Sequence, residues 1–280
     1  MDHVTWSDEQ TATDVTVDGH DLAVAYHEDG PDGGSDEPPV VFLHGIPTWS
    51  YLWRDIVPSI AEERRTIAPD LLGYGNSAMH DGFDRSIRAQ EAMLEALLDD
   101  LGAETATLVA HDIGGGVALR FAAHDPARVD RLVLSNAVCY DSWPVEFVST
   151  LGLPETTDLE REELDARLES AFVEGAYGEA DPDFVAGMKA PWLTDEGQVS
   201  LVRNAVATNT NHTTEIDYGS ITAETLLLWG EDDVMQPYGY AERLAEELAD
   251  AELAPLSGAY HWVPEDRPDA YSDRLLNFLH

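Results

Sequence analysis

Short apolar runs alternate with helix-forming segments along most of the chain, and this alternation restricts the fold more than any other feature. The helix-forming segment 86–102 is typical, because Ser86 can cap its first turn and Gly102 can end it. Strands that are separated by helices pair in parallel, and wholly apolar strands are buried on both faces. The sequence therefore predicts an α/β fold, a mostly parallel twisted sheet with helices on both faces. The expected strands are 40–43, 66–68, 107–110, 132–134, 225–229 and 253–256.

Two segments depart from this alternation. The β-forming residues of 13–26 flank a turn at Asp18-Gly19, which predicts a hairpin. Residues 140–220 have helical periodicity without a clear buried strand, as in a lid inserted between two strands. The expected units are a core, 1–139 and 221–280, and a helical cap, 140–220.

The chain is strongly acidic, with 55 Asp and Glu residues against 15 Lys and Arg and a formal net charge of −40. Nucleic acids and anionic membranes both attract basic surfaces, so the composition argues against either partner. Lys189 is the only lysine, and the acidic residues are spread over the whole length. At molar salt the Debye length is about 3 Å, which screens the repulsion among such charges. The charge therefore indicates a halophilic protein.

No feature of the sequence suggests export, a metal or a cofactor. Residues 1–10 include neither a basic nor an apolar stretch, and no apolar run reaches about 18 residues. The single cysteine, Cys139, has apolar neighbours and is expected to be buried. No cluster of His, Cys and carboxylate residues has metal-ligand spacing. We expect a cytoplasmic protein, a monomer or small homo-oligomer, that takes a small-molecule substrate and needs no metal or cofactor.

One junction between a strand and a helix provides the main candidate for chemistry. The sequence AHDIG, residues 110–114, follows an apolar strand and opens a helix. Its small residues let the backbone turn tightly, as in a nucleophile elbow with serine at the centre. Asp112 takes the central position here, at a helix N-terminus that favours negative charge. Asp112 is therefore the expected nucleophile.

Two further strand ends supply an acid and a base. Glu231, Asp232 and Asp233 follow one apolar strand, and His261 follows the last expected strand. In a parallel sheet these positions share an edge with Asp112, and ligand sites of open sheets lie at that edge. The chain order of nucleophile, acid and histidine differs from the orders of chymotrypsin and subtilisin.

An aspartate nucleophile narrows the reaction. A reference pKa of about 3.9 leaves Asp112 ionised at neutral pH without help from a base. Attack on an ester would give a reactive anhydride, whereas displacement at a saturated carbon gives an alkyl–enzyme ester. His261 would then deprotonate the water that hydrolyses this ester, while an acid orients the imidazole. Small apolar alkyl halides or epoxides are the expected substrates.

Three segments resemble the haloalkane dehalogenase branch of the α/β-hydrolases. They are the run HGIPTWSYLWR at 44–54, the run DLLGYGNS at 70–77, and the aspartate elbow. Epoxide hydrolases share the His-Gly-x-Pro and His-Asp features. The resemblance covers roughly 35–135 and 225–280 and implies the α/β-hydrolase fold.

The resemblance also implies the remaining parts of the site. The family pattern places the acid three residues after a glycine, here Gly230, which selects Asp233. The backbone N–H groups of Ile46 and Ile113 would form the oxyanion hole. Haloalkane dehalogenases usually have tryptophan at the second of these positions and asparagine or glutamate at the first, and tryptophan holds the halide. Aliphatic side chains cannot donate to a halide.

The sequence therefore leaves two leaving groups possible, a halide or the oxygen of an epoxide. A cap tryptophan, Trp143 or Trp192, could hold a halide instead, as in a haloalkane dehalogenase-like hydrolase. Epoxide opening usually needs two cap tyrosines as donors, as in an epoxide hydrolase. A third alternative, from another class, is a non-catalytic ligand-binding homologue. The residues expected to line the pocket are Trp49, Trp143, Trp192, Tyr140, Tyr177 and Tyr218.

Overall fold

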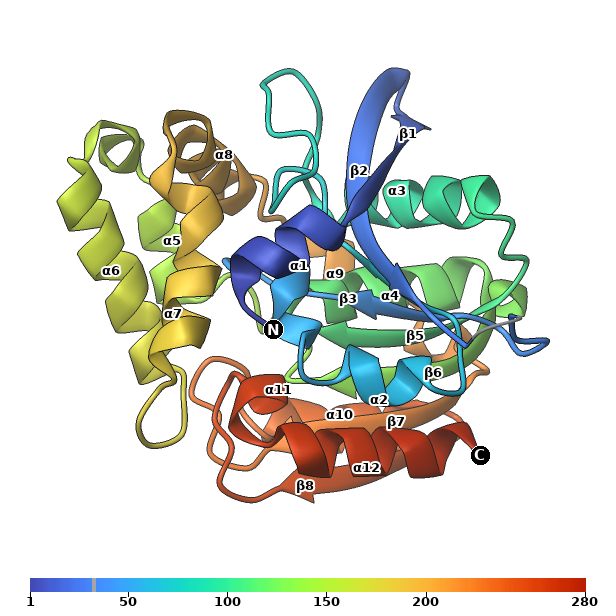
Figure 1. Cartoon of the computed structure of the whole chain (residues 1–280). Helices are drawn as coiled ribbons and strands as arrows, with labels where there is room; N and C mark the ends of the chain where they lie inside the picture. The colour runs from blue at the N-terminus through green and yellow to red at the C-terminus, as the bar shows by residue number, and fades with distance from the viewer. Residues whose placement is uncertain (32–33) are drawn as a thin grey trace.

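Eight strands form a single sheet in the computed structural model, which describes residues 1–31 and 34–280 (Figure 1). Their order is β1-β2-β4-β3-β5-β6-β7-β8. β2 pairs antiparallel with β1 and with β4, and the other neighbouring strands are parallel. The strands are β1 (Thr11–Val17), β2 (His20–Asp29), β3 (Val40–Leu43), β4 (Thr66–Pro69), β5 (Ala106–His111), β6 (Val129–Ser135), β7 (Glu224–Gly230) and β8 (Ala251–Leu256).

This sheet confirms the fold expected from the sequence. Each of the six expected strands is present, and β3 to β6 are buried along most of their length. The hairpin is also present, as the pair β1 and β2. Asp18 and Gly19 have φ angles of 48° and 82°, the left-handed conformation that a two-residue hairpin turn requires.

Helices cover both faces of the sheet. In Figure 1, α2 and α12 pack together on the face turned toward the viewer, and α3 and α4 pack together on the opposite face. Ser86 accepts the Ala89 N–H and so caps α3, as expected. The helices are α1 (His3–Glu9), α2 (Val57–Ala61), α3 (Ile87–Asp100), α4 (Ile113–His124), α5 (Glu146–Leu151), α6 (Arg161–Glu174), α7 (Pro182–Lys189), α8 (Asp195–Val206), α9 (Asn211–Thr214), α10 (Gly239–Glu247), α11 (Val263–Asp266) and α12 (Pro268–Leu279).

The segment expected to form the cap, residues 140–220, lies between β6 and β7 and holds helices α5 to α9. Figure 1 shows α5, α6, α7 and α8 as a group at the left of the sheet. Hydrogen bonds join the two connecting segments: Thr213 Oγ1 donates to Tyr140 O (2.6 Å) and Thr210 Oγ1 donates to Trp143 O (2.8 Å). The two segments that connect these helices to the sheet are therefore hydrogen-bonded to each other.

The sequence did not predict α1. Its Trp6 side chain is fully buried and stacks on His27 with the ring centroids 4.0 Å apart. The Trp6 indole N–H donates to Ser50 Oγ (3.0 Å), and Asp2 caps the helix. The helix thus depends on tertiary contacts, which a local pattern does not reveal.

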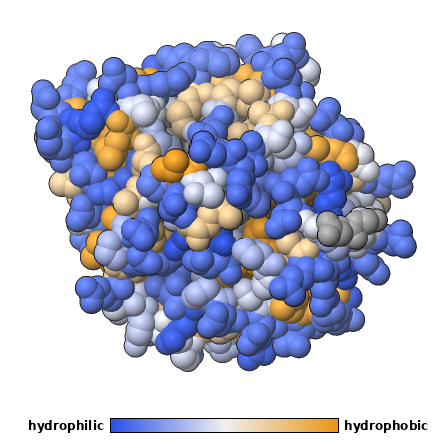
Figure 2. Space-filling model, viewed as in Figure 1, coloured by the Kyte–Doolittle hydropathy of each residue, from blue (hydrophilic) through white to orange (hydrophobic). Residues whose placement is uncertain are grey.

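Hydrophilic residues predominate on the face drawn in Figure 2. The single lysine is not among the exposed residues: Lys189 is buried and pairs with Asp165 (2.8 Å) and Glu169 (2.9 Å) of α6. Within the described residues, no helix is both long enough and apolar enough to cross a membrane.

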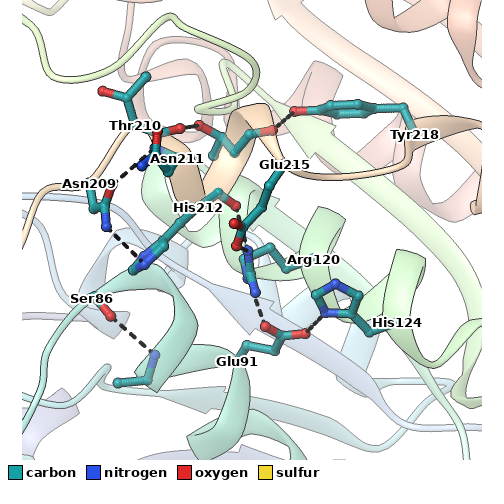
Figure 3. Close-up of polar contacts among 12 residues, drawn as sticks. Ser86, Glu91, Arg120, His124, Asn209, Thr210, Asn211, His212, Glu215 and Tyr218 are labelled. Atoms are coloured by element: carbon teal, nitrogen blue, oxygen red, sulfur yellow. Dashed lines mark hydrogen bonds and ion pairs between the residues drawn. The ribbon is translucent and has the colours of Figure 1, made fainter.

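A second buried cation joins three helices (Figure 3). Arg120 of α4 donates to Glu91 of α3 (2.7 Å), to the His212 carbonyl of α9 (2.8 Å) and to Glu215 (2.6 Å). Glu91 also contacts His124 Nδ1 at 2.5 Å. Because the Arg120 and Glu91 side chains are only 5% and 13% exposed, each depends on the other for compensation of its charge.

Arg120→Ala is expected to lower the free energy of unfolding by about 3–5 kcal/mol, because it leaves the nearly buried Glu91 with only the His124 imidazole beside it. The matched control is Arg161→Ala, which removes a pair with Asp195, whose side chain is 98% exposed. That loss should be below about 1 kcal/mol. Denaturant unfolding of both variants at one KCl concentration checks the difference, and equal losses would contradict it.

Candidate active site

Asp112 lies on a sharp turn between β5 and α4. Its φ and ψ angles are 51° and −123°, a conformation that costs a non-glycine residue about 1–3 kcal/mol. The neighbouring chain approaches closely. A Cβ atom on Gly114 would lie 2.5 Å from the carbonyl oxygens of Leu43 and His44, and one on Gly45 would lie 2.4 Å from Asp112 Cβ. The two glycines therefore permit the turn that lifts the Asp112 side chain from the sheet edge.

The two oxygens of the Asp112 carboxylate have different surroundings. Oδ1 accepts the Ile46 N–H at 2.9 Å, and Oδ2 lies 3.6 Å from His261 Nε2. Ile113, the other expected oxyanion donor, is the first residue of α4, where helix N–H groups have no partner within the helix. Asp112 is 4% exposed, so these contacts are shielded from bulk water.

His261 bridges Asp112 to a second carboxylate. Its Nδ1 lies 2.9 Å from Asp233 Oδ2, at the carboxyl end of β7. Asp233 is buried, whereas Glu231 and Asp232, the other two acids of that loop, are exposed. The structure thus brings together the three residues singled out from the sequence, and among the three acids only Asp233 contacts His261.

Asn136 belongs to the same cluster and was not foreseen. It follows β6 with a φ of 44°. Its amide donates to Asp233 Oδ2 (2.5 Å) and to Tyr260 O (3.0 Å), and its oxygen accepts the Gly230 N–H (3.0 Å). A polar residue directly after an apolar strand, at the edge where the other side chains meet, is the signal that could have found it. Asn136 fixes the position of Asp233.

The charges of this cluster are coupled. Burial disfavours the imidazolium, but Asp233 and Asp112 outweigh burial and raise the pKa of His261 to about 10. Burial likewise would raise the pKa of Asp112, yet the contact with His261 holds this pKa below its usual value. At neutral pH the free protein therefore holds an imidazolium between two carboxylates.

Two other histidines near Asp112 are neutral. His44 Nδ1 donates to Gly45 O (2.9 Å) and Nε2 accepts the Leu71 N–H (2.9 Å), and burial lowers the pKa of His44 to about 4. His111 Nδ1 contacts Ser135 O (3.0 Å), and burial lowers its pKa to about 3. His44 thereby connects the loop that carries Ile46 to the end of β4, so both histidines have structural roles.

The expected pocket tryptophans differ in what their indole N–H groups do. Trp192 donates to Pro47 O (2.6 Å), and Trp49 donates to Gly187 O (2.9 Å). Trp143 is 5% exposed, and its indole nitrogen has no hydrogen-bond partner among the described residues. Trp143 is therefore the one of these three whose donor remains available.

The three cap tyrosines have other partners or lie at the surface. Tyr140 Oη donates to Glu247 (2.8 Å). Tyr218 Oη donates to Thr213 O (3.0 Å) and accepts the Tyr140 N–H (2.8 Å). Tyr177 is 48% exposed and packs edge-on against Tyr260. In this conformation Tyr140 and Tyr218 each use their hydroxyl proton within the protein.

A cleft of about 780 Å³ lies apart from this cluster. It is bounded by α1, the β1–β2 hairpin and the start of α8, and Trp49 is the only expected pocket residue in its lining. Asp112, Asp233 and His261 do not line it. Within residues 1–31 and 34–280, no group of three or more His, Cys, Asp or Glu side chains could hold a metal ion.

Comparison with known proteins agrees with the geometry. The family model of the α/β hydrolase fold matches residues 38–268. The chain is 28% identical over 251 residues to haloalkane dehalogenase 2 of Mycobacterium tuberculosis, covering 85% of this chain and 87% of that protein. It is 25% identical over 270 residues to epoxide hydrolase 1 of Caenorhabditis elegans, covering 88% and 66%.

A solved haloalkane dehalogenase from Bradyrhizobium elkani superposes with a TM-score of 0.79 at 26% identity, covering 96% of this chain and 97% of that one. The chain therefore belongs to the α/β-hydrolase fold family and is an enzyme of the hydrolase class. This finding supports an enzyme over the non-catalytic ligand-binding homologue.

Proposed function

We propose that the chain is a haloalkane dehalogenase-like hydrolase in which Asp112 attacks a saturated carbon of a small apolar substrate and His261 activates the water that releases the product. Asp233 orients His261. One observation carries this proposal: the Asp112 carboxylate meets a backbone N–H on one oxygen and an imidazole on the other, and that imidazole contacts a second carboxylate. The similarity to dehalogenases and to an epoxide hydrolase supports the same class of reaction.

The two carboxylate oxygens take different roles. Oδ2 of Asp112 forms the bond to carbon while the leaving group departs with the bonding electron pair. Oδ1 becomes the carbonyl oxygen of the ester and stays on the Ile46 N–H, where negative charge develops in the second step. Water then attacks the Asp112 carbonyl carbon and gives a proton to His261 Nε2. The alkoxide that leaves with the former Oδ2 takes this proton from His261 and becomes the alcohol, and Asp112 keeps the oxygen of the water.

The electrostatics of the cluster change between the two steps. Before the reaction, His261 lies between two carboxylates that raise its pKa to about 10. Alkylation turns Asp112 into a neutral ester and so removes one of these two negative charges. The pKa of His261 must then fall, because an opposite charge beside it is lost. The first step thereby prepares the base that the second step needs.

The two half-reactions are expected to differ in pH dependence. The lowered pKa of Asp112 keeps the nucleophile ionised from about pH 6 to pH 9, so the rate of alkylation should be flat there. Hydrolysis needs neutral His261, so its rate should rise with pH and level off once the imidazole of the ester form has lost its proton. Rapid-quench mass spectrometry at several pH values measures both rates. An alkylation rate that follows the same titration as hydrolysis would contradict this assignment.

The donors within the cap favour halide as the leaving group. The hydroxyl groups of Tyr140 and Tyr218 donate hydrogen bonds to Glu247 and to the Thr213 carbonyl. The Trp143 indole, in contrast, is a buried donor without a partner among the described residues. A buried N–H group of this kind has lost its hydrogen bonds to water, and only a ligand that accepts a hydrogen bond from it can replace them. Trp143 is therefore the candidate halide donor in this proposal, with epoxide opening as the alternative.

Trp143→Phe is expected to slow cleavage of the carbon–halogen bond of a terminal haloalkane by about 10–100-fold. The reason is that one buried hydrogen bond to the departing halide is worth about 1.5–3 kcal/mol. The control is Trp53→Phe. The Trp53 indole nitrogen is also buried and without a partner among the described residues, but it packs between Phe42 and Tyr271 of the core. Halide release and epoxide opening are measured side by side in wild type and both variants. Brisk opening of an epoxide with no halide release would favour the epoxide hydrolase instead.

A further inference from the structure

The loop that carries His261 is hydrogen-bonded to the cap. The backbone N–H groups of His261 and Trp262 both donate to the Gly175 carbonyl, at 3.0 and 3.3 Å, just after α6. The Trp262 indole N–H donates to the Phe172 carbonyl in the last turn of α6 (3.0 Å). The backbone position of His261 thus depends on where the end of α6 lies.

Asp266 joins the same two segments a second time. Its Oδ1 accepts the Tyr177 N–H of the cap, and its Oδ2 accepts the Tyr260 N–H directly before His261, both at 2.8 Å. The Asp266 N–H itself donates to Trp262 O (2.8 Å) within the start of α11. One carboxylate therefore bridges the cap to the residue that precedes His261.

Close packing leaves little freedom at this junction. The Trp262 ring lies 4.6 Å from the His261 ring and 5.4 Å from the Phe172 ring, centroid to centroid. A Cβ atom on Gly175 would lie 2.4 Å from Trp262 Nε1. A shift of the cap end is therefore transmitted to Trp262 and, through it, to the imidazole.

We propose that Asp266 is a positioning residue that couples the cap segment to His261, so that the base is held in place for water activation while this junction is intact. This role rests on the proposed function of His261 as the base. It explains why a carboxylate outside the Asp112–His261–Asp233 cluster accepts one N–H from the cap and one from the His261 loop.

Amide hydrogen exchange, resolved to single residues by NMR, tests the coupling without a substrate. In Asp266→Asn, the side chain keeps a single acceptor oxygen, so either the Tyr177 or the Tyr260 amide loses its acceptor directly, and neither of these two amides is informative. The His261 and Trp262 amides keep their acceptor, Gly175 O, and should nevertheless exchange at least about 10-fold faster, because the junction opens as a unit. Unchanged exchange at these two amides would overturn the proposal.

The matched control is Asp269→Asn. Asp269 is an exposed carboxylate in the first turn of α12. Exchange at His261 and Trp262 should stay at the wild-type rate in this variant, and an equal acceleration would overturn the specific role of Asp266. If Asp266→Asn accelerates exchange throughout the chain, the Gly175→Ala variant is tested in place of Asp266→Asn. This variant leaves Asp266 intact and should accelerate the same two amides by displacing Trp262; no change in them would overturn the coupling.

Turnover gives a second readout. With a haloalkane that alkylates Asp112, Asp266→Asn should accumulate the ester during steady state, because hydrolysis slows while alkylation does not. Equal slowing of both steps would mean a general structural defect and would overturn the positioning role. If wild type forms no ester with any haloalkane or epoxide tested, the proposed function fails, whereas the exchange result still decides the coupling.

Discussion

His261→Gln is expected to stop the reaction at a covalent intermediate and to slow its hydrolysis by about 10²–10⁴-fold, the usual contribution of a general base. Asp112 needs no base for its attack, because its pKa lies below the usual value and the carboxylate is already ionised. Only the second step takes a proton from water. The variant should therefore consume one equivalent of substrate and then stall.

Intact-protein mass measures this outcome. The mass should rise by that of the alkyl group, and peptide mapping should locate the group on Asp112. Asp112→Asn is the control: it should form no adduct at first, although slow deamidation would restore some reactivity. Sustained turnover by His261→Gln at the wild-type rate, or an adduct on another residue, would contradict the assignment.

Transfer from molar to about 0.1 M KCl is expected to lower the melting temperature by about 10 °C or more, given that each kcal/mol lost lowers the Tm of a domain of this size by about 2–4 °C. With 55 acids and 15 Lys and Arg, most carboxylates have no cationic partner. The Debye length grows from about 3 to about 10 Å over that range, so the remaining charges repel each other more strongly. Folding concentrates these charges, and the folded state bears most of the added repulsion.

Scanning calorimetry across a KCl series checks this expectation. Sorbitol at equal osmolality is the control, because an excluded osmolyte strengthens burial without screening charge. The Tm should follow ionic strength and recover little in sorbitol. A Tm that is indifferent to KCl, or that sorbitol restores fully, would remove the argument for a halophilic protein.

The sheet and the centre of the site could be predicted because local patterns determine them. The strands β3 to β8 are short apolar runs between helix signals, and parallel pairing brings their carboxyl ends to one edge. Asp112 stands directly after β5, and His261 lies in the loop that follows β8, so topology brings both to the same edge of the sheet. The choice among the three acids of the β7 loop depended on family resemblance, and the structure distinguishes them by burial.

Features that depend on packing between distant segments could not be predicted in this way. Trp6 makes α1 a part of the core only through His27 and Ser50, which lie far along the chain. By sequence, the Trp192 indole was a candidate halide donor. In the structure it donates its hydrogen bond to Pro47 O, because the cap packs against the loop that carries Ile46. Asn136 was overlooked because nothing in its local sequence indicates that it bonds to Asp233, 97 residues away.

Single turnover in ¹⁸O-labelled water, with enzyme in excess over substrate, reveals which carbon atom the water attacks. If Asp112 forms an ester that water cleaves at its carbonyl carbon, the label must enter the Asp112 carboxylate, and the first alcohol released must have no label from the solvent. Mass spectrometry of the peptide that contains residues 110–114 and of the product measures both fates. We expect label in the peptide and none in the alcohol. Label in the alcohol and none in the peptide would mean that water attacks the substrate directly, and Asp112 would not be the nucleophile.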